Sequence, residues 1–335
     1  MRHRGGLCTV AVAGLVMLAA GCAQTTAATT GLARGMGWVA QQSGTGDSLF
    51  GVCATSADGA WAVGEAGHLL ATSDGGAHWR SVSCGTSEDL FAVTFTDRSH
   101  GWLLADDEVV RTSDAGASWS VVRLGSGLAL QAMAFTGPLN GIVVGSIARG
   151  NHQVGIIFST SDGGRHWRAA WEQSSPFPAD IHPDAIGVVA RQHIVVASAT
   201  GGGVVLSSSD GGANWSLATV TNVVAGIQAF VFPAGPRGWG VGIDGRIVET
   251  PDGGRTWRLR ETIGQSILTA VDFASKTEAW AVGTEGTLVH TADSGSHWSA
   301  VPGLARAKAL QAVSFDWGSG HGWAVGEDGT IYAYR

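Results

Sequence analysis

The segment Thr72-Ser73-Asp74-Gly75-Gly76-Ala77-His78-Trp79 decides the fold of this chain, because its pattern returns five more times. The shared pattern is Thr or Ser, Asp two positions later, Gly two positions after the Asp, and Trp three positions after that Gly. The Asp and Trp residues of the six copies are Asp74, Trp79, Asp114, Trp119, Asp162, Trp167, Asp210, Trp215, Asp252, Trp257, Asp293 and Trp298. The Trp recurs every 40 to 48 residues, a spacing typical of four-stranded propeller blades.

The rest of each repeat has a constant order. An apolar segment such as residues 90–95 comes first, and a Gly-Trp-Ala-Val-Gly segment such as residues 322–326, or a variant of it, comes second. A tight turn follows, often an acidic residue and Gly, which suits a hairpin because both tolerate positive φ. A third apolar segment then leads into the Asp/Gly/Trp turn, and an outer segment begins near the Trp. The repeat therefore predicts four short antiparallel strands.

The number of repeats follows from the first strands. Seven of them are present, starting near Leu49, Leu90, Leu130, Ala185, Ile227, Leu268 and Leu310. Only six Asp/Gly/Trp turns follow them, and the seventh unit ends after its third strand. The unpaired segment around Trp38 supplies the missing outer strand, which removes the open sheet edges. We therefore predict an all-β, seven-bladed propeller, closed by this N-terminal strand and monomeric.

The first 21 residues have the features of a bacterial lipoprotein signal peptide. Arg2 and Arg4 form a basic start, and residues 7–18 form an apolar core that is too short to span a bilayer. The segment Leu18-Ala19-Ala20-Gly21-Cys22 resembles a lipobox. The resemblance implies lipidation at Cys22, export, and attachment to the outer face of the cell membrane. Ordinary signal cleavage at a small-residue site is the alternative.

The remaining organisation is simple. Residues 22–35 are small and polar, which predicts a flexible tether, and the propeller is expected over residues 36–335. No other stretch is apolar enough for a transmembrane helix. Without Arg2 and Arg4, the 20 Lys and Arg residues become 18 against 27 Asp and Glu, so the net charge is −9. This charge disfavours nucleic acid as a partner.

Two cysteines remain in the predicted domain, Cys53 and Cys84. A disulfide is conceivable in an exported protein. The predicted strand order opposes it, because Cys53 lies on an innermost strand and Cys84 near the end of an outermost one. Three strand spacings exceed the Cα separation that a disulfide permits. Neither residue has the partner spacing of a metal site.

The Asp/Gly/Trp turn predicts a structural role for its residues. The Asp can accept backbone N–H groups, the Gly supplies positive φ, and the Trp buries apolar surface. One carboxylate per turn is too few for calcium, so we expect no metal and no cofactor. His78, His166 and His297 share one position of the turn. A metal held by the histidines of the irregular third and fourth repeats is a weaker alternative, and these are His152, His166, His182 and His193.

The turns between second and third strands should all emerge on one face. Five of the seven blades contribute carboxylates to this rim, namely Glu65, Asp106, Asp107, Glu108, Asp244, Glu285, Glu327 and Asp328. Such a ring would attract a basic protein surface. The alternative is that acidic residues simply suit solvated turns. A second candidate is the longest connection, residues 171–183, which is either functional or a tolerated insertion.

The repeats resemble two known groups. The turn resembles the Asp-box, or BNR repeat. The full repeat, with Gly-Trp-Ala-Val-Gly followed by Asp-Gly-Gly-x-x-Trp, is similar to the photosystem II stability/assembly factors over residues 38–335. That resemblance implies a seven-bladed, non-catalytic propeller that binds newly made membrane-protein subunits. The family's partner surface is basic, whereas this chain is acidic. We carry no functional residue over from the family.

The sequence favours a binding or assembly module over an enzyme. Sialidases also carry Asp-boxes, but they need an arginine triad and a Tyr nucleophile with a Glu partner. The only tyrosines are Tyr332 and Tyr334, two apart on one strand, so they share a face. A glycosidase with two carboxylates, a glycan-binding propeller, and a surface protein without a strong partner remain alternatives. The expected partner is a membrane or envelope protein.

Overall fold

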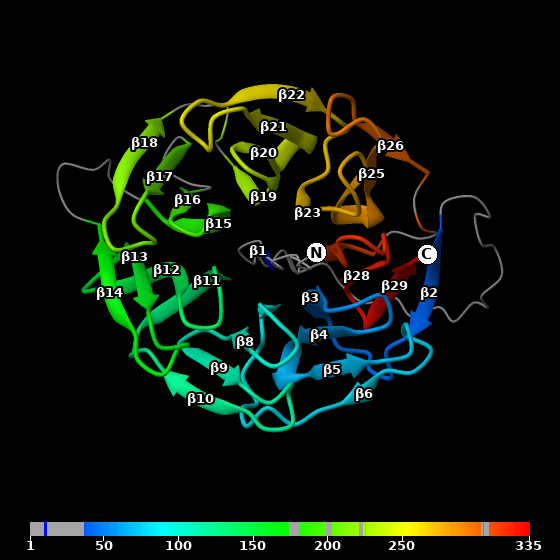
Figure 1. Cartoon of the computed structure of the whole chain (residues 1–335), viewed down its shortest axis with the longest axis horizontal. Helices are drawn as coiled ribbons and strands as arrows, with labels where there is room; N and C mark the ends of the chain where they lie inside the picture. The colour runs from blue at the N-terminus through cyan, green and yellow to red at the C-terminus, as the bar shows by residue number, and fades with distance from the viewer. Residues whose placement is uncertain are drawn as a thin grey trace, which may run out of the picture.

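Seven four-stranded blades surround one axis in the computed structural model, which confirms the predicted propeller (Figure 1). The structure describes residues 10–11, 37–173, 181–198, 203–220, 224, 226–302, 304 and 308–335. The strands of every blade are antiparallel, and in blades 1 to 6 they run outward from the axis in sequence order. The second and third strands are buried almost throughout because neighbouring blades cover both of their faces, which explains their continuous apolar sequences.

The strand bounds are as follows. Blades 1 to 3 contain β3 (Leu49–Ala54), β4 (Ala60–Gly64), β5 (Leu69–Thr72) and β6 (Arg80–Ser81); β7 (Ala92–Phe95), β8 (Gly101–Leu104), β9 (Glu108–Thr112) and β10 (Ser120–Arg123); and β11 (Leu128–Phe135), β12 (Gly141–Arg149), β13 (His152–Thr160) and β14 (Arg168–Glu172). Blades 4 and 5 contain β15 (Pro183–Ala190), β16 (His193–Ser198), β17 (Val204–Ser208) and β18 (Ser216–Val220); and β19 (Ile227–Ala234), β20 (Arg237–Gly242), β21 (Arg246–Thr250) and β22 (Arg258–Thr262). Blades 6 and 7 contain β23 (Leu268–Phe273), β24 (Ala279–Gly283), β25 (Leu288–Thr291) and β26 (Ser299–Val301); and β27 (Leu310–Phe315), β28 (Gly322–Gly326), β29 (Thr330–Tyr334) and β2 (Trp38–Gln42).

Blade 7 is built from both ends of the domain, as the sequence predicted. Strand β2 pairs antiparallel with β29, from Trp38 opposite Tyr334 to Gln42 opposite Thr330 (Figure 1). The buried Trp38 indole lies 5.5 Å from the Trp280 ring of blade 6 and 5.2 Å from Tyr334. The closing strand therefore joins two blades through aromatic packing as well as through its backbone ladder.

The joints between blades bring the two repeated motifs into contact. Trp102 on β8 donates its Nε1–H to the Gly163 carbonyl in the Asp/Gly/Trp turn of the next blade, at 3.0 Å. Trp239 on β20 does the same to Gly295, at 3.3 Å. A Cβ on Gly295 would overlap the Trp239 indole, and its φ of +74° also favours glycine. The Trp of the second strand in one blade therefore packs against, and donates a hydrogen bond to, a Gly of the Asp/Gly/Trp turn in the next blade.

A second joint lies near the axis. On β27, the Ser314 hydroxyl accepts the Ala54 N–H of blade 1, at 3.1 Å. The equivalent residue on β23 is Asp272, whose carboxylate accepts the Phe315 N–H of blade 7 and the N–H of its own neighbour Phe273, both at 2.8 Å. Burial raises the pKa of Asp272 to about 7, although both backbone bonds act to lower it. An ionisable group therefore takes the place of a neutral hydroxyl at one joint.

The third blade differs from its prediction. In the sequence, residues 146–155 take the place of the tight turn between the second and third strands, which predicts an irregular connection. Instead, β12 and β13 extend through them and pair from Gly141 opposite Thr160 to Arg149 opposite His152, leaving a two-residue turn. Arg149 forms two charge-assisted bonds with Glu172 on β14, at 2.9 and 3.0 Å. The pairing of β12 with β13 thus continues to the tip of the hairpin, although the polar composition of this segment did not predict strands there.

Three tight turns share one backbone conformation. Single 3-10 turns connect the second and third strands of blades 1, 5 and 6, as η1 (Glu65–Gly67), η3 (Ile243–Gly245) and η4 (Thr284–Gly286). In addition, β1 (Val10–Ala11) lies near the axis and pairs with β11 (Figure 1). No helix in the described ranges is long and apolar enough to cross a membrane.

Candidate functional site

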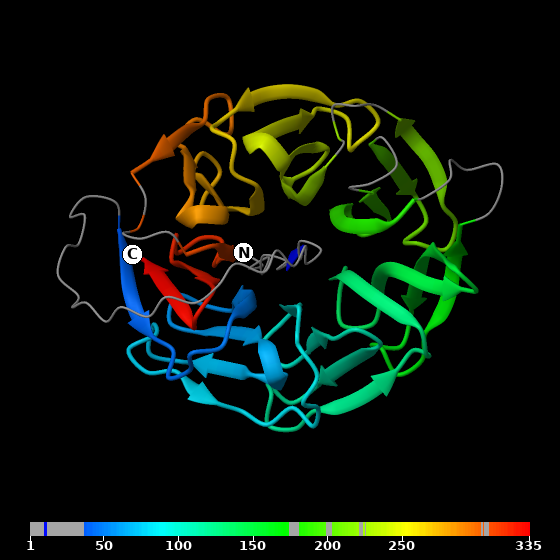
Figure 2. The same ribbon diagram turned by 180° about the vertical axis from the view of Figure 1, so that it is seen from behind.

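The strand order gives the propeller two different faces (Figures 1 and 2 view them from opposite sides). The Asp-box face carries the turns between first and second strands and the Asp/Gly/Trp turns between third and fourth strands. The acidic face carries the turns between second and third strands and the connections between blades. Every candidate residue can be assigned to one of these faces from the bounds of its neighbouring strands.

On the Asp-box face, the turn residues bind one another. The Thr72 hydroxyl donates to Asp74 Oδ1 at 2.9 Å and accepts the Gly76 N–H at 2.8 Å. Asp74 Oδ1 also accepts the His78 N–H at 3.0 Å, and its Oδ2 lies 2.8 Å from His78 Nδ1. The backbone bond from His78, followed by its side-chain bond, holds the pKa of Asp74 well below its usual range. The carboxylate is therefore committed to its own turn.

The other five Asp-boxes repeat this network. Their Thr or Ser hydroxyl donates to the Asp at 2.7 to 2.9 Å. The residue four places after the Asp bonds to it through both its N–H and its side chain, whichever polar type it is; these residues are Ser118, His166, Asn214, Thr256 and His297. The three histidines in register are therefore turn-forming side chains, interchangeable with Ser, Asn and Thr.

The acidic face holds seven of the eight predicted rim carboxylates, and Glu108 is the exception. Glu108 begins β9 with only 1% of its surface exposed, and its carboxylate pairs with Arg123 of the outer strand at 2.7 Å. The sequence placed it on the rim because it follows Asp106 and Asp107 directly. Strand alternation instead turns it into the joint between blades 1 and 2.

Two rim carboxylates help to build the fold. Glu65 Oε2 accepts the Ser48 N–H at 3.0 Å, and Glu327 Oε2 accepts the Ala309 N–H at 3.2 Å. In blade 6 the Thr284 hydroxyl accepts the Ile267 N–H in the same way. The first residue of the turn thus fixes the chain just before the first strand. Glu65 and Glu327 are positioning residues of the scaffold as well as surface charges.

Three other rim residues occupy the next turn position, where Asp244 lies 4.0 Å from Arg246. Asp244, Glu285 and Asp328 have φ between +52° and +58°, and all three are exposed. Asp328 pairs with Lys308 at 2.7 Å, an exposed contact that adds little stability. Positive φ is costly for a non-glycine residue, so these turns hold their acidic side chains outward in a defined backbone conformation.

The sequence did not predict three further carboxylates on this face, because they lie in connections between blades. These are Asp47, Glu88 and Asp89. The signal was present, since each connection starts at the end of a fourth strand and therefore emerges beside the turns between second and third strands. Asp47 lies 2.6 Å from His68. Partial burial, followed by the charges of Asp89, Asp107 and Glu88, raises the pKa of Asp106.

The two faces differ in charge. In the described turns and connections, the acidic face has ten carboxylates and one basic residue, Lys308; the carboxylates are Asp47, Glu65, Glu88, Asp89, Asp106, Asp107, Asp244, Glu285, Glu327 and Asp328. The Asp-box face also has ten, namely the six Asp-box aspartates with Asp58, Asp97, Glu278 and Asp316. It balances them in part with six exposed cations, Arg98, Arg165, Arg191, Arg255, Lys276 and Arg335.

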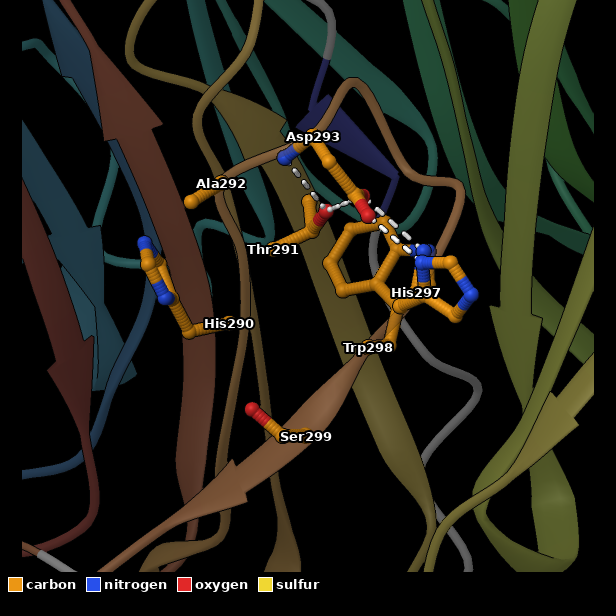
Figure 3. Close-up of a pocket in the computed structure, with 7 residues that line it drawn as sticks. All are labelled: His290, Thr291, Ala292, Asp293, His297, Trp298 and Ser299. Carbon is orange, nitrogen blue, oxygen red and sulfur yellow. Dashed lines mark hydrogen bonds and ion pairs between the residues drawn. The ribbon is translucent and has the colours of Figure 1, made fainter.

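A shallow pocket of about 290 Å³ lies on the Asp-box turn of blade 6 (Figure 3). His290, Asp293, His297 and Ser299 supply polar groups to it. Figure 3 shows Asp293 occupied by its bonds to Thr291 and His297, while His290 lies apart from them. The pocket is therefore a hollow beside a structural turn, without converging catalytic groups.

A Tyr–Glu pair of the kind that sialidases need is present but is built for packing. Tyr334 donates its hydroxyl to Glu278 Oε1 at 2.7 Å, and His290 Nε2 lies 3.3 Å from the same oxygen. Burial, and then the bond to Glu278, raises the pKa of Tyr334 to about 12. Its ring packs against Trp38 and Trp280. A phenol that is harder to ionise than usual is a poor nucleophile.

The other candidate sites gain no support from the geometry. The described residues contain no group of three or more His, Cys, Asp or Glu side chains arranged to hold a metal ion. His152 lies at the acidic-face end of its hairpin, whereas His193 begins β16 at the Asp-box face. Cys53 and Cys84 are both buried and are not joined in a disulfide, and burial raises the pKa of the Cys84 thiol.

Several predictions fall outside the described residues. They are the signal segment other than Val10–Ala11, the tether with Cys22, and residues 174–180 of the long connection. Lipidation at Cys22 and a role for that connection stay predictions.

Comparison with known proteins identifies the fold and the family. The model of the photosynthesis system II assembly factor YCF48 family matches residues 32–196, 77–231 and 228–306. Solved structures of the same architecture include "YCF48 bound to D1 peptide", with 21% identity, a TM-score of 0.68, and coverage of 89% of this chain and 96% of that one. YCF48 from Cyanidioschyzon merolae has 19% identity and a TM-score of 0.69, with coverage of 89% and 98%.

More distant propellers share the fold alone. The GH74 xyloglucanase from Xanthomonas campestris has 15% identity and a TM-score of 0.65, with coverage of 89% of this chain and 53% of that one. No curated protein matches the sequence. The matched family segments together span residues 32–306, most of the chain and nearly all of its blades. This chain therefore belongs to the photosystem II assembly factor YCF48 family of BNR-repeat β-propellers.

Proposed function

We propose that the protein is a non-catalytic binding module whose acidic face captures a basic segment of another protein. The observation that carries this proposal is the charge of that face, whose described turns and connections hold ten carboxylates and one lysine, with Arg123, Arg149 and Arg246 at the bordering strand ends. Carboxylates arranged around one face attract a complementary surface over a long range and set its orientation. Family membership supports protein binding, because one structurally similar YCF48 is bound to a D1 peptide.

Hydrogen bonds and neighbouring charges indicate which part of the acidic face is best suited to bind the partner. Glu65 and Glu327 hold backbone N–H groups of the scaffold, so they contribute charge but are not free to reorient. Asp106 lies among three like charges, Asp89, Asp107 and Glu88, without a cation beside them in the described contacts. A Lys or Arg from a partner would relieve this repulsion, which makes the sector between blades 1 and 2 the favoured contact.

We further propose that the mature protein is exported and anchored through lipid at Cys22, and acts there as a monomer. The lipobox-like sequence supports this placement. The partner class is then a membrane or envelope protein that exposes basic residues outside the bilayer. Hydrolysis of carbohydrate is not favoured by the geometry around Tyr334 and Glu278 described above.

The test is zero-length cross-linking with a carbodiimide in intact cells, which joins carboxylates to partner lysines. The variant Asp106→Lys with Asp107→Lys should lose the cross-linked partner, because it reverses the charge at the favoured contact. The control Asp58→Lys with Asp316→Lys makes the same change in net charge on the Asp-box face and should keep it. Equal capture by both variants would contradict the assignment of the binding face. Hydrolysis of chromogenic glycosides by the purified protein would contradict the non-catalytic role.

A further inference from the structure

The chain enters the propeller at one particular face. Trp38 pairs with Tyr334, and Tyr334 pairs with Gly322, which directly follows the turn between the first two strands of blade 7. The N–H of Arg335, the residue after β29, donates to the Gly37 carbonyl at 3.0 Å. This bond holds the start of the described domain beside the end of β29. Gly37 and Trp38 are therefore fixed at the Asp-box face, and the tether must leave the domain from that side.

The charges on the two faces also favour placing the Asp-box face toward an anionic lipid surface. All six exposed cations in the described part of the Asp-box face lie in its turns or at Arg335, which is bonded to Gly37. In the described turns and connections of the acidic face, by contrast, Lys308 is the one Lys or Arg among ten carboxylates, and Arg123, Arg149 and Arg246 at the bordering strand ends pair with Glu108, Glu172 and Asp244. Bacterial and other cell membranes carry anionic lipids, which attract Lys and Arg and repel carboxylates within a Debye length of about 8 to 10 Å.

The number of residues between Cys22 and Gly37 determines whether the charges of the domain come close enough to the lipid headgroups to interact with them. Fourteen residues, 23–36, separate Cys22 from Gly37. A flexible chain of that length has a root-mean-square span of about 20 Å. The end of the domain that carries Gly37 therefore stays close to the lipid surface, and turning the opposite face toward the lipid would bring its carboxylates against anionic headgroups.

We propose that the Asp-box face lies toward an anionic lipid surface and that the acidic face points away from it into the aqueous phase. This inference rests on the proposed lipid anchor at Cys22. It specifies the proposed function further, since a partner that uses the acidic face must approach from the aqueous side. That partner is a soluble protein or the extramembrane part of a membrane protein, and not a segment embedded in the bilayer.

The experiment uses the full lipidated protein, reconstituted into phosphatidylcholine vesicles with or without phosphatidylglycerol. A fluorescent donor is attached at Ala77→Cys on the Asp-box face or at Ser87→Cys on the acidic face, and the acceptor is on a lipid headgroup. Both positions are exposed, and they belong to blade 1 or to the connection that leaves it. The protein without these substitutions controls for labelling of the buried Cys53 and Cys84.

Energy transfer should be more efficient from position 77 than from position 87, and phosphatidylglycerol should widen the difference. The variant Arg98→Glu with Lys276→Glu should lose the part added by phosphatidylglycerol, because both side chains are exposed and neither forms an ion pair with another described residue. Equal transfer from both positions, or more from position 87, would overturn the orientation. Failure of the protein to float with the vesicles would instead overturn the anchor on which it rests, and carbodiimide cross-linking tests protein binding independently of both.

Discussion

Replacement of Asp272 by Ser should remove a pH-dependent loss of stability at the joint between blades 6 and 7. Asp272 accepts N–H groups from Phe273 and Phe315, and burial raises its pKa to about 7 from the usual 3.8. Between about pH 4 and pH 7 the folded chain keeps a proton that the unfolded chain has released. The free energy of unfolding therefore falls as the pH rises through this window, and levels off above about 7.

The size of the effect follows from the two pKa values. The difference corresponds to about 4 kcal/mol between pH 4 and pH 8. Asp272 retains part of its exposed surface, so screening lowers the expected penalty to about 2 to 4 kcal/mol. For a domain of this size, that is a decrease in Tm of roughly 4 to 8 °C. Ser at this position can still bridge the blades, as Ser314 does to Ala54 at the next joint.

The assay is thermal unfolding of the wild-type protein and the Asp272→Ser variant at pH 5 and pH 8. The variant should match or slightly trail the wild type at pH 5 and exceed it at pH 8. The other ionisable groups are common to both proteins, so their contributions cancel in the comparison. Ser314→Ala is the control, since it loses a neutral bridge and should cost about 1 kcal/mol at both pH values. The same pH dependence in wild type and variant would refute the role assigned to Asp272.

Three further perturbations test the scaffold. Trp38→Ala should cost about 3 to 5 kcal/mol in thermal unfolding, because it removes the packing against Trp280 and Tyr334, whereas Val39→Ala, at a residue 48% exposed, should have little effect. Gly295→Ala should lower stability by about 1 to 3 kcal/mol more than Gly264→Ala, since both have positive φ but only Gly295 faces a Trp indole; equal losses would contradict the Trp–Gly joint. Asp210→Asn should lower the free energy of unfolding at pH 7, and it should make the decrease of that free energy between about pH 4 and pH 2 smaller. Backbone and side-chain bonds from Asn214 lower the pKa of Asp210 to about 2, so its contribution is present above the unfolded pKa and is lost as pH falls through the folded one; an unchanged acid limb in unfolding scans would count against this account.

The sequence alone determined the repeat, the blade number and the closure, because their signals are local. The Asp-box is closed by bonds that reach four residues from its Thr or Ser hydroxyl and four from its Asp, so the same eight-residue pattern produces the same turn wherever it occurs. Counting first strands against turns was enough to assign the segment around Trp38 to blade 7.

The tertiary structure decided which residues meet across blades and which charges reach a face. The alternation that buries Glu108 against Arg123 depends on where β9 begins, and acidic runs in a sequence do not reveal that point. Glu88 and Asp89 approach Asp106 only because successive blades are placed side by side around an axis. The bonds from Asp272 to Phe315 and from Trp239 to Gly295 link residues 43 and 56 positions apart. Such contacts are set by the rotation between neighbouring sheets, which no pattern within a single repeat encodes.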